Sequence, residues 1–189
     1  MNEKYLDYII KHIPELETPR LILRKIKKSD AADMFEYASK EDVTKYLLWN
    51  AHESLKYTKK YLKFLVSKYK TGEYLDWGIV LKSNNKLIGT CGFASLDLAN
   101  AKCEIGYVLN PDYHKNGYAY EAVGKILEYA FDTLGLNRIE ARVIKGNEPS
   151  ISLLKRCGMT EEGEGREEIY VKGEYKSLIH FSLLKGERL

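Results

Sequence analysis

The feature that most constrains the fold is one long amphipathic helix pattern in the second half of the chain. From Ala119, apolar residues recur at offsets 0, 3, 4, 7, 8, 11, 12 and 15, and the last of them is Leu134. This spacing places a single apolar stripe along a helix. Gly135 follows directly and can end it. Any fold for this chain has to accommodate a helix over this stretch.

The remaining patterns predict strands and shorter helices around that helix, and no linker or internal repeat divides the chain. Apolar and alternating runs predict strands over residues 21–24, 77–81, 86–94, 102–109, 138–144, about 159–170 and 174–184. Capping residues and apolar spacing predict helices over about 31–37, 55–69 and 149–157. This order indicates an α+β (mixed α/β) plan around one sheet.

We divide the chain into a short leader, residues 1–17, and one domain over residues 18–189. The leader lacks the continuous apolar run that a secretory signal requires. Four of its residues can form one helical stripe before Pro14 ends it: Tyr5, Ile9, Ile10 and Ile13.

Charge and cysteine content narrow the function classes. Lys and Arg total 30 against 27 Asp and Glu, and this net charge of +3 is too small for a dedicated nucleic-acid-binding protein. The three cysteines lie far apart and form no C-x-x-C pair, as is usual for reduced thiols in the cytoplasm. No apolar run is long enough to span a membrane. We therefore expect a cytoplasmic monomer or homodimer that binds neither nucleic acid nor a membrane.

Several common catalytic motifs are missing from the sequence. It contains no G-x-x-x-x-G-K-[ST], no G-x-G-x-x-G, no G-x-S-x-G and no H-E-x-x-H. The four histidines are scattered without a pair at helical spacing, so we expect no metal ion. Cys91 lies in an apolar strand with no histidine near it in sequence, which favours a buried, inert thiol over a covalent nucleophile.

The most informative segment, residues 110–121, joins a predicted strand to the long helix: Asn-Pro-Asp-Tyr-His-Lys-Asn-Gly-Tyr-Ala-Tyr-Glu. The first N–H groups of a helix are unpaired and partly positive, so a loop entering a helix can bind phosphate. Gly117 allows close approach of a ligand, Ala119 keeps the next turn small, and Lys115 adds a cation. A pyrophosphate-binding loop is one interpretation, and a plain turn within a solvated loop is the other.

Residues 104–122 resemble the acetyl-CoA motif of the GNAT superfamily of N-acetyltransferases: Glu-Ile-Gly-Tyr-Val-Leu-Asn-Pro-Asp-Tyr-His-Lys-Asn-Gly-Tyr-Ala-Tyr-Glu-Ala. Three further segments are similar, in order, to the branch of ribosomal-protein N-terminal (alanine/serine) acetyltransferases. They are Thr-Pro-Arg-Leu-Ile-Leu-Arg at 18–24, Asn-Glu-Pro-Ser-Ile-Ser-Leu-Leu-Lys-Arg-Cys-Gly-Met at 147–159, and residues 175–184. The resemblance covers about residues 17–185 and favours the pyrophosphate-binding interpretation.

The resemblance implies a mostly antiparallel, twisted sheet in which the strand ending near Leu109 and the strand at 138–144 run parallel and splay apart. Acetyl-CoA, the co-substrate, would enter this gap, and its pantetheine arm would pair with the backbone of Val108 and Leu109. Asn147 and Ser150 match positions that reach the pantetheine and thioester, although both residue types also favour helix caps. The pyrophosphate would contact the N–H groups of Lys115, Asn116, Gly117, Tyr118 and Ala119.

The resemblance also implies direct acetyl transfer to a primary amine, either a protein N-terminus or a small amine. Because amines are largely protonated at neutral pH, a general base is useful, and Glu104 matches the acidic position of the motif. The alternative for Glu104 is an ordinary carboxylate paired with a neighbouring lysine. The backbone N–H of Val108 would stabilise the oxyanion, and Ser150 would orient or protonate the leaving sulfur.

Several positions depart from the family pattern. Leu154 stands where many members have a tyrosine four residues after the serine, which leaves Ser150 as the remaining polar group for the leaving thiolate. His114 stands where relatives often have Gln, Arg or Trp, and Ser177 with Phe181 stands where they often have Asp and Tyr. These differences would alter the acceptor pocket.

Residues 42–69 would shape that pocket. Trp49, Tyr46 and Tyr57 are candidates to line it, although aromatic residues at such spacing also occur in cores. The missing tyrosine leaves a second function open, a non-catalytic module that binds acyl-CoA and reports it to a partner.

Overall fold

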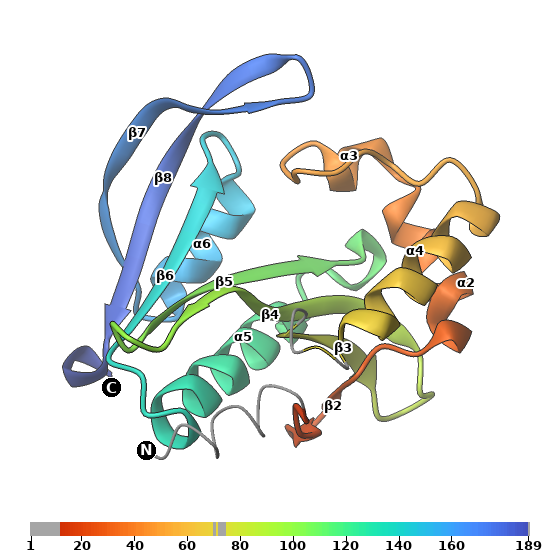
Figure 1. Cartoon of the computed structure of the whole chain (residues 1–189), viewed down its shortest axis with the longest axis horizontal. Helices are drawn as coiled ribbons and strands as arrows, with labels where there is room; N and C mark the ends of the chain where they lie inside the picture. The colour runs from red at the N-terminus through yellow and green to blue at the C-terminus, as the bar shows by residue number, and fades with distance from the viewer. Residues whose placement is uncertain (1–11, 70, 72–74, 189) are drawn as a thin grey trace.

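Eight strands form a single sheet in the order β1-β2-β3-β4-β5-β6-β8-β7 in the computed structural model, which describes residues 12–69, 71 and 75–188 (Figure 1). All neighbouring strands are antiparallel except β5 and β6, which are parallel. The predicted mixed α/β sheet with one parallel pair is thereby confirmed. The strands are β1 (Leu16–Glu17), β2 (Leu21–Arg24), β3 (Leu75–Leu81), β4 (Leu87–Asp97), β5 (Lys102–Leu109), β6 (Arg138–Ile144), β7 (Thr160–Val171) and β8 (Glu174–Leu184).

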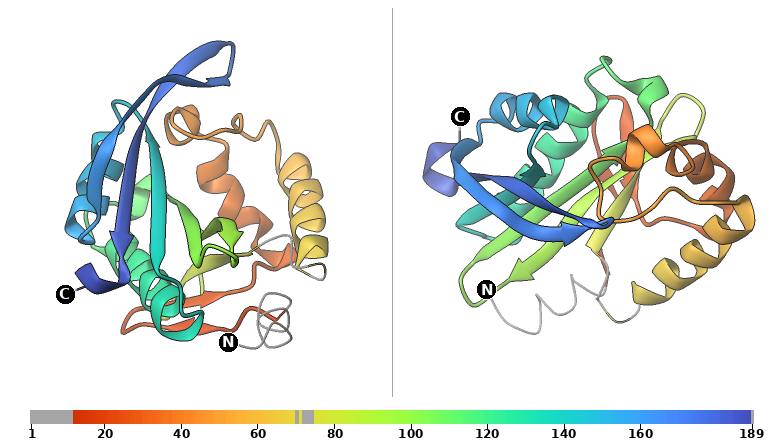
Figure 2. Two further views of the ribbon diagram at one scale, coloured as in Figure 1. Left: turned by 60° about the vertical axis from the view of Figure 1, so that its left-hand side comes forward. Right: turned by 90° about the horizontal axis from the view of Figure 1, so that it is seen from above.

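Helices cover both faces of the sheet (Figure 2). One face carries α2 (Ala31–Ala38), α3 (Glu41–Thr44) and α4 (Leu55–Lys68), and the other carries α5 (Tyr118–Glu128) and α6 (Glu148–Arg156). The long predicted helix is present, but its last part is a π-helical turn over Tyr129–Thr133. The short helix α3 was not predicted, because its four residues contain a single apolar side chain, Val43. None of the helices in the described ranges is long and apolar enough to cross a membrane.

The core explains why these segments adopt their structure. Ser54 caps α4, since its hydroxyl accepts a 3.2 Å hydrogen bond from the amide of Tyr57. At the centre, the fully buried Trp77 packs edge-on against Phe93 and Tyr129, with ring centroids 5.7 and 5.5 Å away. Burial of this aromatic cluster between the sheet and the π-helical turn fixes α5 against the strands.

The predicted leader joins the sheet at its described end. The helix expected over Tyr5 to Ile13 lies almost entirely outside the described residues. Ile13 is buried, the indole N–H of Trp77 donates to the carbonyl of Pro14 at 2.6 Å, and β1 pairs with β2. Residues 13–17 therefore pack as part of the domain.

The β7–β8 hairpin projects beyond the rest of the sheet toward α3 (Figures 1 and 2). Its two-residue turn, Lys172-Gly173, has φ values of 54° and 85°, the left-handed pair that such tight hairpins require. The ammonium of Lys172 donates to the carbonyl of Thr44 at 2.5 Å. The tip of the hairpin thereby contacts the last residue of α3.

Candidate active site

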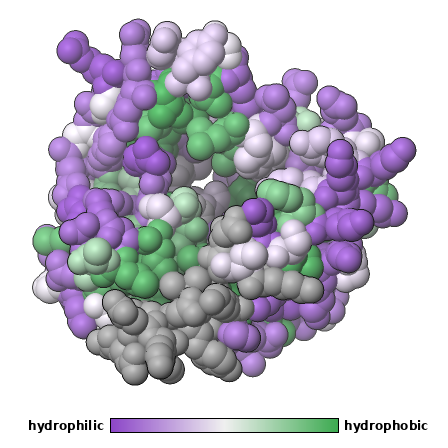
Figure 3. Space-filling model, in the orientation of Figure 1, coloured by the Kyte–Doolittle hydropathy of each residue, from purple (hydrophilic) through white to green (hydrophobic). Residues whose placement is uncertain are grey.

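The parallel pair of strands opens into a gap. β5 and β6 are paired only from Lys102 to Glu104 and from Arg138 to Glu140. Beyond these residues β5 continues beside β4, while β6 continues beside β8. The predicted splay is therefore present, and Glu104 lies where the strands part. Figure 3 shows a hollow near the centre of this face of the molecule.

Backbone register decides which groups of β5 point into the gap. The amide of Asn110 donates to the carbonyl of Ile88 at 2.7 Å, and Thr90 is paired with Val108. Polar groups of alternate residues face the same side of a strand, so those of Val108 also face β4. The N–H and C=O of Tyr107 and Leu109 face the gap. The register therefore favours Tyr107 and Leu109 over Val108 as backbone partners of a ligand there.

The loop before α5 has the geometry of an anion-binding turn. Lys115 and Gly117 both have positive φ, 62° and 80°, and Gly117 is the N-cap of the helix. The first intrahelical bond runs from the amide of Glu121 to the carbonyl of Gly117, at 3.0 Å. The amides between these residues, including those of Tyr118 and Ala119, therefore have no intrahelical acceptor and lie at the positive end of the helix.

A brace from the start of the chain holds this loop in place. The guanidinium of Arg20 donates to the carbonyl of Asn116 at 2.9 Å and to the carboxylate of Glu121 at 2.7 Å. Glu121 also accepts from the hydroxyl of Thr18 at 2.6 Å and from the amide of Arg20 at 2.9 Å. Burial opposes ionisation, but these hydrogen bonds outweigh it and lower the pKa of Glu121. Sequence reasoning identified residues 18–24 only by resemblance and missed this contact.

The short helix α6 carries the other predicted cofactor residues. Asn147 is its N-cap, and its side chain accepts from the amide of Ser150 at 3.4 Å, as expected of a capping pair. The hydroxyl of Ser150 lies 2.6 Å from that of Tyr107, on the strand opposite. Burial raises the pKa of Tyr107, so its phenol stays protonated at neutral pH. Sequence reasoning missed Tyr107, since only the fold brings it to Ser150.

Glu104 forms an ion pair at the floor of the gap. Both of its carboxylate oxygens accept from Arg142, each at 2.9 Å, and Arg142 also lies 3.8 Å from Glu168. The hydrogen bond to Glu104 raises the pKa of Arg142, which remains charged. This arrangement is close to the ion-pair alternative, with arginine in place of lysine, and it occupies the oxygens that a general base would use.

A small chamber of about 70 Å³ lies on the opposite side of β5, beneath α2 and α4. Thr90 and Val108, paired across β4 and β5, form part of its floor. Its lining consists of Met34, Tyr37, Ala38, Trp49, His52, Tyr61, Asp76, Thr90 and Val108. Of the three aromatic residues expected to line the acceptor pocket, Trp49 is in this lining, whereas Tyr46 and Tyr57 are not. Tyr57 packs edge-on against His52, with ring centroids 4.9 Å apart. His52 was not singled out by the sequence.

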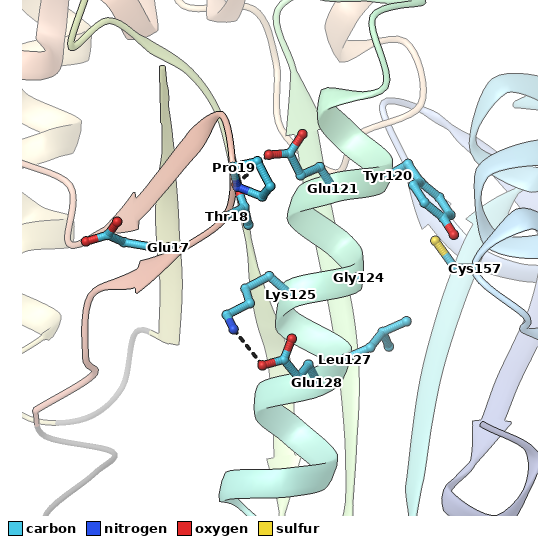
Figure 4. Close-up of a pocket in the computed structure, with 10 residues that line it drawn as sticks. All are labelled: Glu17, Thr18, Pro19, Tyr120, Glu121, Gly124, Lys125, Leu127, Glu128 and Cys157. Atoms are coloured by element: carbon cyan, nitrogen blue, oxygen red, sulfur yellow. Dashed lines mark hydrogen bonds and ion pairs between the residues drawn. The ribbon is translucent and has the colours of Figure 1, made fainter. Parts of the chain in front are cut away.

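A wider groove of about 440 Å³ runs along the exposed side of α5 and is separate from the gap (Figure 4). Thr18 and Pro19 border one side of the helix there, and Tyr120 and Cys157 border the other. A salt bridge between Lys125 and Glu128 crosses part of it. The groove offers a shallow surface rather than a site enclosed between the strands.

The positions that depart from the family pattern have defined structural roles. The ring of His114 donates from Nε2 to the carbonyl of Leu109 at 3.1 Å, which ties the loop to the end of β5. Leu154 and Phe181 are buried in the core, and the hydroxyl of Ser177 accepts from the amide of Glu167 at 3.1 Å. Within the described ranges, no group of three or more His, Cys, Asp and Glu residues could hold a metal ion.

Comparison with known proteins assigns the family. The model of the acetyltransferase (GNAT) domain matches residues 20–160. An uncharacterised N-acetyltransferase of Bacillus licheniformis, p20, is 37% identical over 172 residues, which are 91% of this chain and 97% of the relative. A spermidine N(1)-acetyltransferase of Vibrio cholerae is 22% identical over 170 residues, 90% of this chain and 96% of the relative.

A solved structure agrees. The ribosomal-protein-S5-alanine acetyltransferase of Vibrio fischeri superposes with a TM-score of 0.76 at 25% identity, covering 91% of this chain and 97% of that chain. The similarity to the ribosomal-protein branch, inferred from four sequence segments, is thus confirmed. Together the family match, the parallel pair that splays and the loop at Gly117 show that this chain belongs to the GNAT family and is an acetyl-CoA-dependent N-acetyltransferase.

Proposed function

We propose that the enzyme moves the acetyl group from acetyl-CoA directly to a primary amine while both are bound. One observation carries this proposal: Val108 lines the chamber and lies in the part of β5 beyond its pairing with β6, so it borders both the chamber and the gap. A thioester held along β5 would then lie beside an acceptor in the chamber. The amine nitrogen would bond to the carbonyl carbon, the C–S bond would break, and the sulfur would leave as a thiolate.

The cofactor would follow the groups that face the gap. The pantetheine arm pairs with the backbone of Tyr107 and Leu109, which refines the expected pair of Val108 and Leu109. The backbone amide of Tyr107 or Leu109, rather than that of Val108, stabilises the oxyanion. The pyrophosphate lies on the loop formed by Lys115, Asn116, Gly117, Tyr118 and Ala119, where free amides at a helix N-terminus favour an anion and Arg20 holds the loop in place. Asn147 and Ser150 approach from α6.

The cysteines support direct transfer rather than an acyl-enzyme route. Cys91 is fully buried, and burial raises its thiol pKa well above the ordinary value. Burial raises the pKa of Cys103 to about 12 and that of Cys157 to about 11. Each thiol therefore stays protonated at neutral pH and is a poor nucleophile.

Ser150 orients toward the leaving thiolate and donates a hydrogen bond to it, supported by Tyr107. Because the phenol stays protonated at neutral pH and lies 2.6 Å from the serine hydroxyl, it can donate a hydrogen bond to Ser150 and turn the serine proton toward the sulfur. The thiolate then takes up the proton that the amine releases through the general base. This pair offers the hydroxyl donor that Leu154 cannot provide on α6. It thereby removes the sequence feature that favoured a non-catalytic acyl-CoA sensor.

Glu104 is the general base of this proposal. Arg142 takes one lone pair on each carboxylate oxygen, so Glu104 acts through a water that donates to one of the lone pairs left free. A Glu104→Gln variant tests this role. We expect turnover to fall and the acidic limb of the pH profile to change, while acetyl-CoA affinity stays the same. Unchanged turnover with an unchanged profile would remove Glu104 from the mechanism.

The acceptor is a small amine or a protein N-terminus, the two classes that the relatives' names contain. Thiol release from acetyl-CoA, measured with a panel of amines and alanine- or serine-terminated peptides, tests the activity. Production of CoA that depends on an amine supports the proposal. Tight binding of acetyl-CoA without CoA production for any amine contradicts it and returns the sensor alternative.

A further inference from the structure

The chamber beneath α2 and α4 contains a polar group that the fold itself does not use. The side chain of Tyr37 is 1% exposed, and its hydroxyl has no hydrogen-bond partner within the described part of the chain. Tyr37 lines the chamber. A buried hydroxyl left without a partner costs about 1–3 kcal/mol, so its retention at a cavity wall points to a ligand that bonds with it.

The other polar groups of the chamber match one kind of ligand. Oxygen-bearing side chains line it from four elements: Tyr37 from α2, Tyr61 from α4, Asp76 from β3 and Thr90 from β4. An ammonium group has three N–H donors and no acceptor, so it can bond with three such oxygens at once. Asp76 is the acidic residue of the lining and supplies the matching charge.

Aromatic rings form much of the remaining lining and also favour a cation. Trp49, His52 and Tyr61 line the chamber, and His52 packs against the other two with ring centroids 5.4 and 5.1 Å away. The ring faces of tryptophan and tyrosine attract ammonium groups. Nδ1 of His52 lies 2.8 Å from the hydroxyl of Thr58, which fixes the ring in place. Burial lowers the pKa of His52, so its imidazole is neutral at pH 7 and does not repel a cation.

The size of the chamber restricts the group that can carry the ammonium. An apolar cavity of about 150 Å³ can hold benzene, which has six non-hydrogen atoms, so a chamber of about 70 Å³ holds roughly three. That is the space of an ammonium and two methylenes. An α-amino group of a peptide is attached to a carbon that also carries a carbonyl and a side chain, and it does not fit.

Building on the proposed function, we infer that the chamber binds the aminomethyl end of the acceptor, and that the acceptor class is an amine on an unbranched alkyl chain. Tyr37 and Asp76 hold the nitrogen, and Ala38 limits the space beside the first carbon. Val108 places this nitrogen next to the strand along which the thioester would lie. Polyamine-like and lysine-side-chain-like amines satisfy this description, whereas protein N-termini do not.

Two isomeric amines test the size argument. The n-butylamine molecule carries its nitrogen on an unbranched carbon, and sec-butylamine carries it on a branched one. We expect kcat/KM to be at least about tenfold higher for n-butylamine, because overpacking a filled cavity is unfavourable by about that factor. Equal values, or faster acetylation of an alanine-terminated peptide than of either amine, would overturn the inference and leave the proposed function intact.

Two variants test the polar contacts. Tyr37→Phe removes only the hydroxyl, and we expect it to raise the KM for n-butylamine about fivefold. Asp76→Asn removes the charge at constant size and should have a larger effect. Both should leave the dissociation constant of acetyl-CoA unchanged. Tyr129→Phe is the matched control, since it alters a buried tyrosine that packs against Trp77 and is absent from the chamber lining. If Tyr37→Phe behaves like this control, the chamber does not hold the amine.

A binding measurement separates this inference from the proposed function. Calorimetry of n-butylamine with the CoA-bound enzyme needs no acetyl transfer. Binding that Asp76→Asn weakens supports the chamber even if the wild type acetylates nothing, in which case the proposed function alone fails. No heat of binding for the wild type overturns the chamber.

Discussion

The two sides of the β5–β6 gap are built in different ways. On the side that we propose for the cofactor, residues 115–119 form the loop before α5, and α6 adds Asn147 and Ser150 close to the end of β6. On the acceptor side, the chamber draws its lining from α2, the segment before α4, α4 itself and the strands β3, β4 and β5. The cofactor side depends mainly on backbone groups, and the acceptor side depends on side chains.

Side-chain substitutions should therefore affect the two sides differently. Backbone amides at a helix N-terminus bind a phosphate whatever the neighbouring side chains are, so the cofactor side tolerates many sequences. The chamber changes its shape with each side chain that lines it. We therefore expect substitutions at the loop to affect the cofactor alone, and substitutions in the chamber to affect the acceptor alone.

The largest effect should come from Gly117→Val. A left-handed conformation costs a residue with a Cβ about 1–2 kcal/mol, and a Cβ here would lie 3.3 Å from Nη2 of Arg20. We expect calorimetry to show acetyl-CoA binding weakened about 30-fold, with the acceptor KM unaffected. Gly124→Ala is the control, because a Cβ there meets nothing within 4 Å. Equal affinity in the two variants would contradict the role of the loop.

A smaller effect is expected from the hydroxyl pair on the cofactor side. Loss of a hydrogen bond that assists the leaving group is worth about 1 kcal/mol, so Ser150→Ala should lower kcat about fivefold. Tyr107→Phe should lower it less, since the serine remains. Steady-state kinetics at saturating acetyl-CoA checks both. A Tyr107→Phe enzyme with a lower kcat than Ser150→Ala would place the phenol, not the serine, next to the sulfur.

The hydrogen bonds that Glu121 accepts from Thr18 and Arg20 should make the stability of the fold depend on pH in acid. Because the folded-state pKa of Glu121 is lowered from 4.5, its ionised form stabilises the fold above pH 4.5, and this contribution is lost as the pH falls through the lowered value. Denaturant unfolding of the wild type and Glu121→Gln should differ at neutral pH and converge in stronger acid. A difference that persists undiminished there would argue against the brace.

The smallest effect concerns the chamber and occurs at higher pH. His52 has a lowered pKa in the fold, so the unfolded chain binds more protons below pH 6.5, and the wild type loses stability as the pH falls from there. The titratable groups that contact this ring or share the chamber with it are Tyr37, Tyr57, Tyr61 and Asp76. His52→Gln should not show this loss when unfolding is compared at about pH 7 and about pH 5. Parallel losses in both proteins would mean that another group is responsible.

Features set by consecutive residues could be predicted from the sequence, whereas contacts between distant residues could not. The long helix, the glycine at its N-terminus and the order of strands are signals from consecutive residues, and the structure confirms them. The contacts of Tyr107 with Ser150 and of Arg20 with Asn116 join residues far apart in sequence. No local pattern shows such contacts, which depend on how the sheet brings the strands and helices together.

The assignment to Val108 shows another limit. Sequence similarity located the strand that would bind the cofactor, but a shift of one residue exchanges the backbone groups that face the gap for those that face the sheet. The hydrogen bond from the amide of Asn110 to Ile88 shows that the backbone groups of Tyr107 and Leu109 face the gap, and only the structure provides it. The lining of the chamber could not be predicted from the sequence, because His52 and Asp76 belong to no recognisable motif.

Hydrogen–deuterium exchange with and without acetyl-CoA tests the central claim most directly. We predict slower exchange in peptides covering residues 107–119 and 147–150, with little change at residues 49–61. Protection confined to residues 17–19 and 120–128, which border the groove on α5, would contradict this account and place the cofactor outside the gap between β5 and β6.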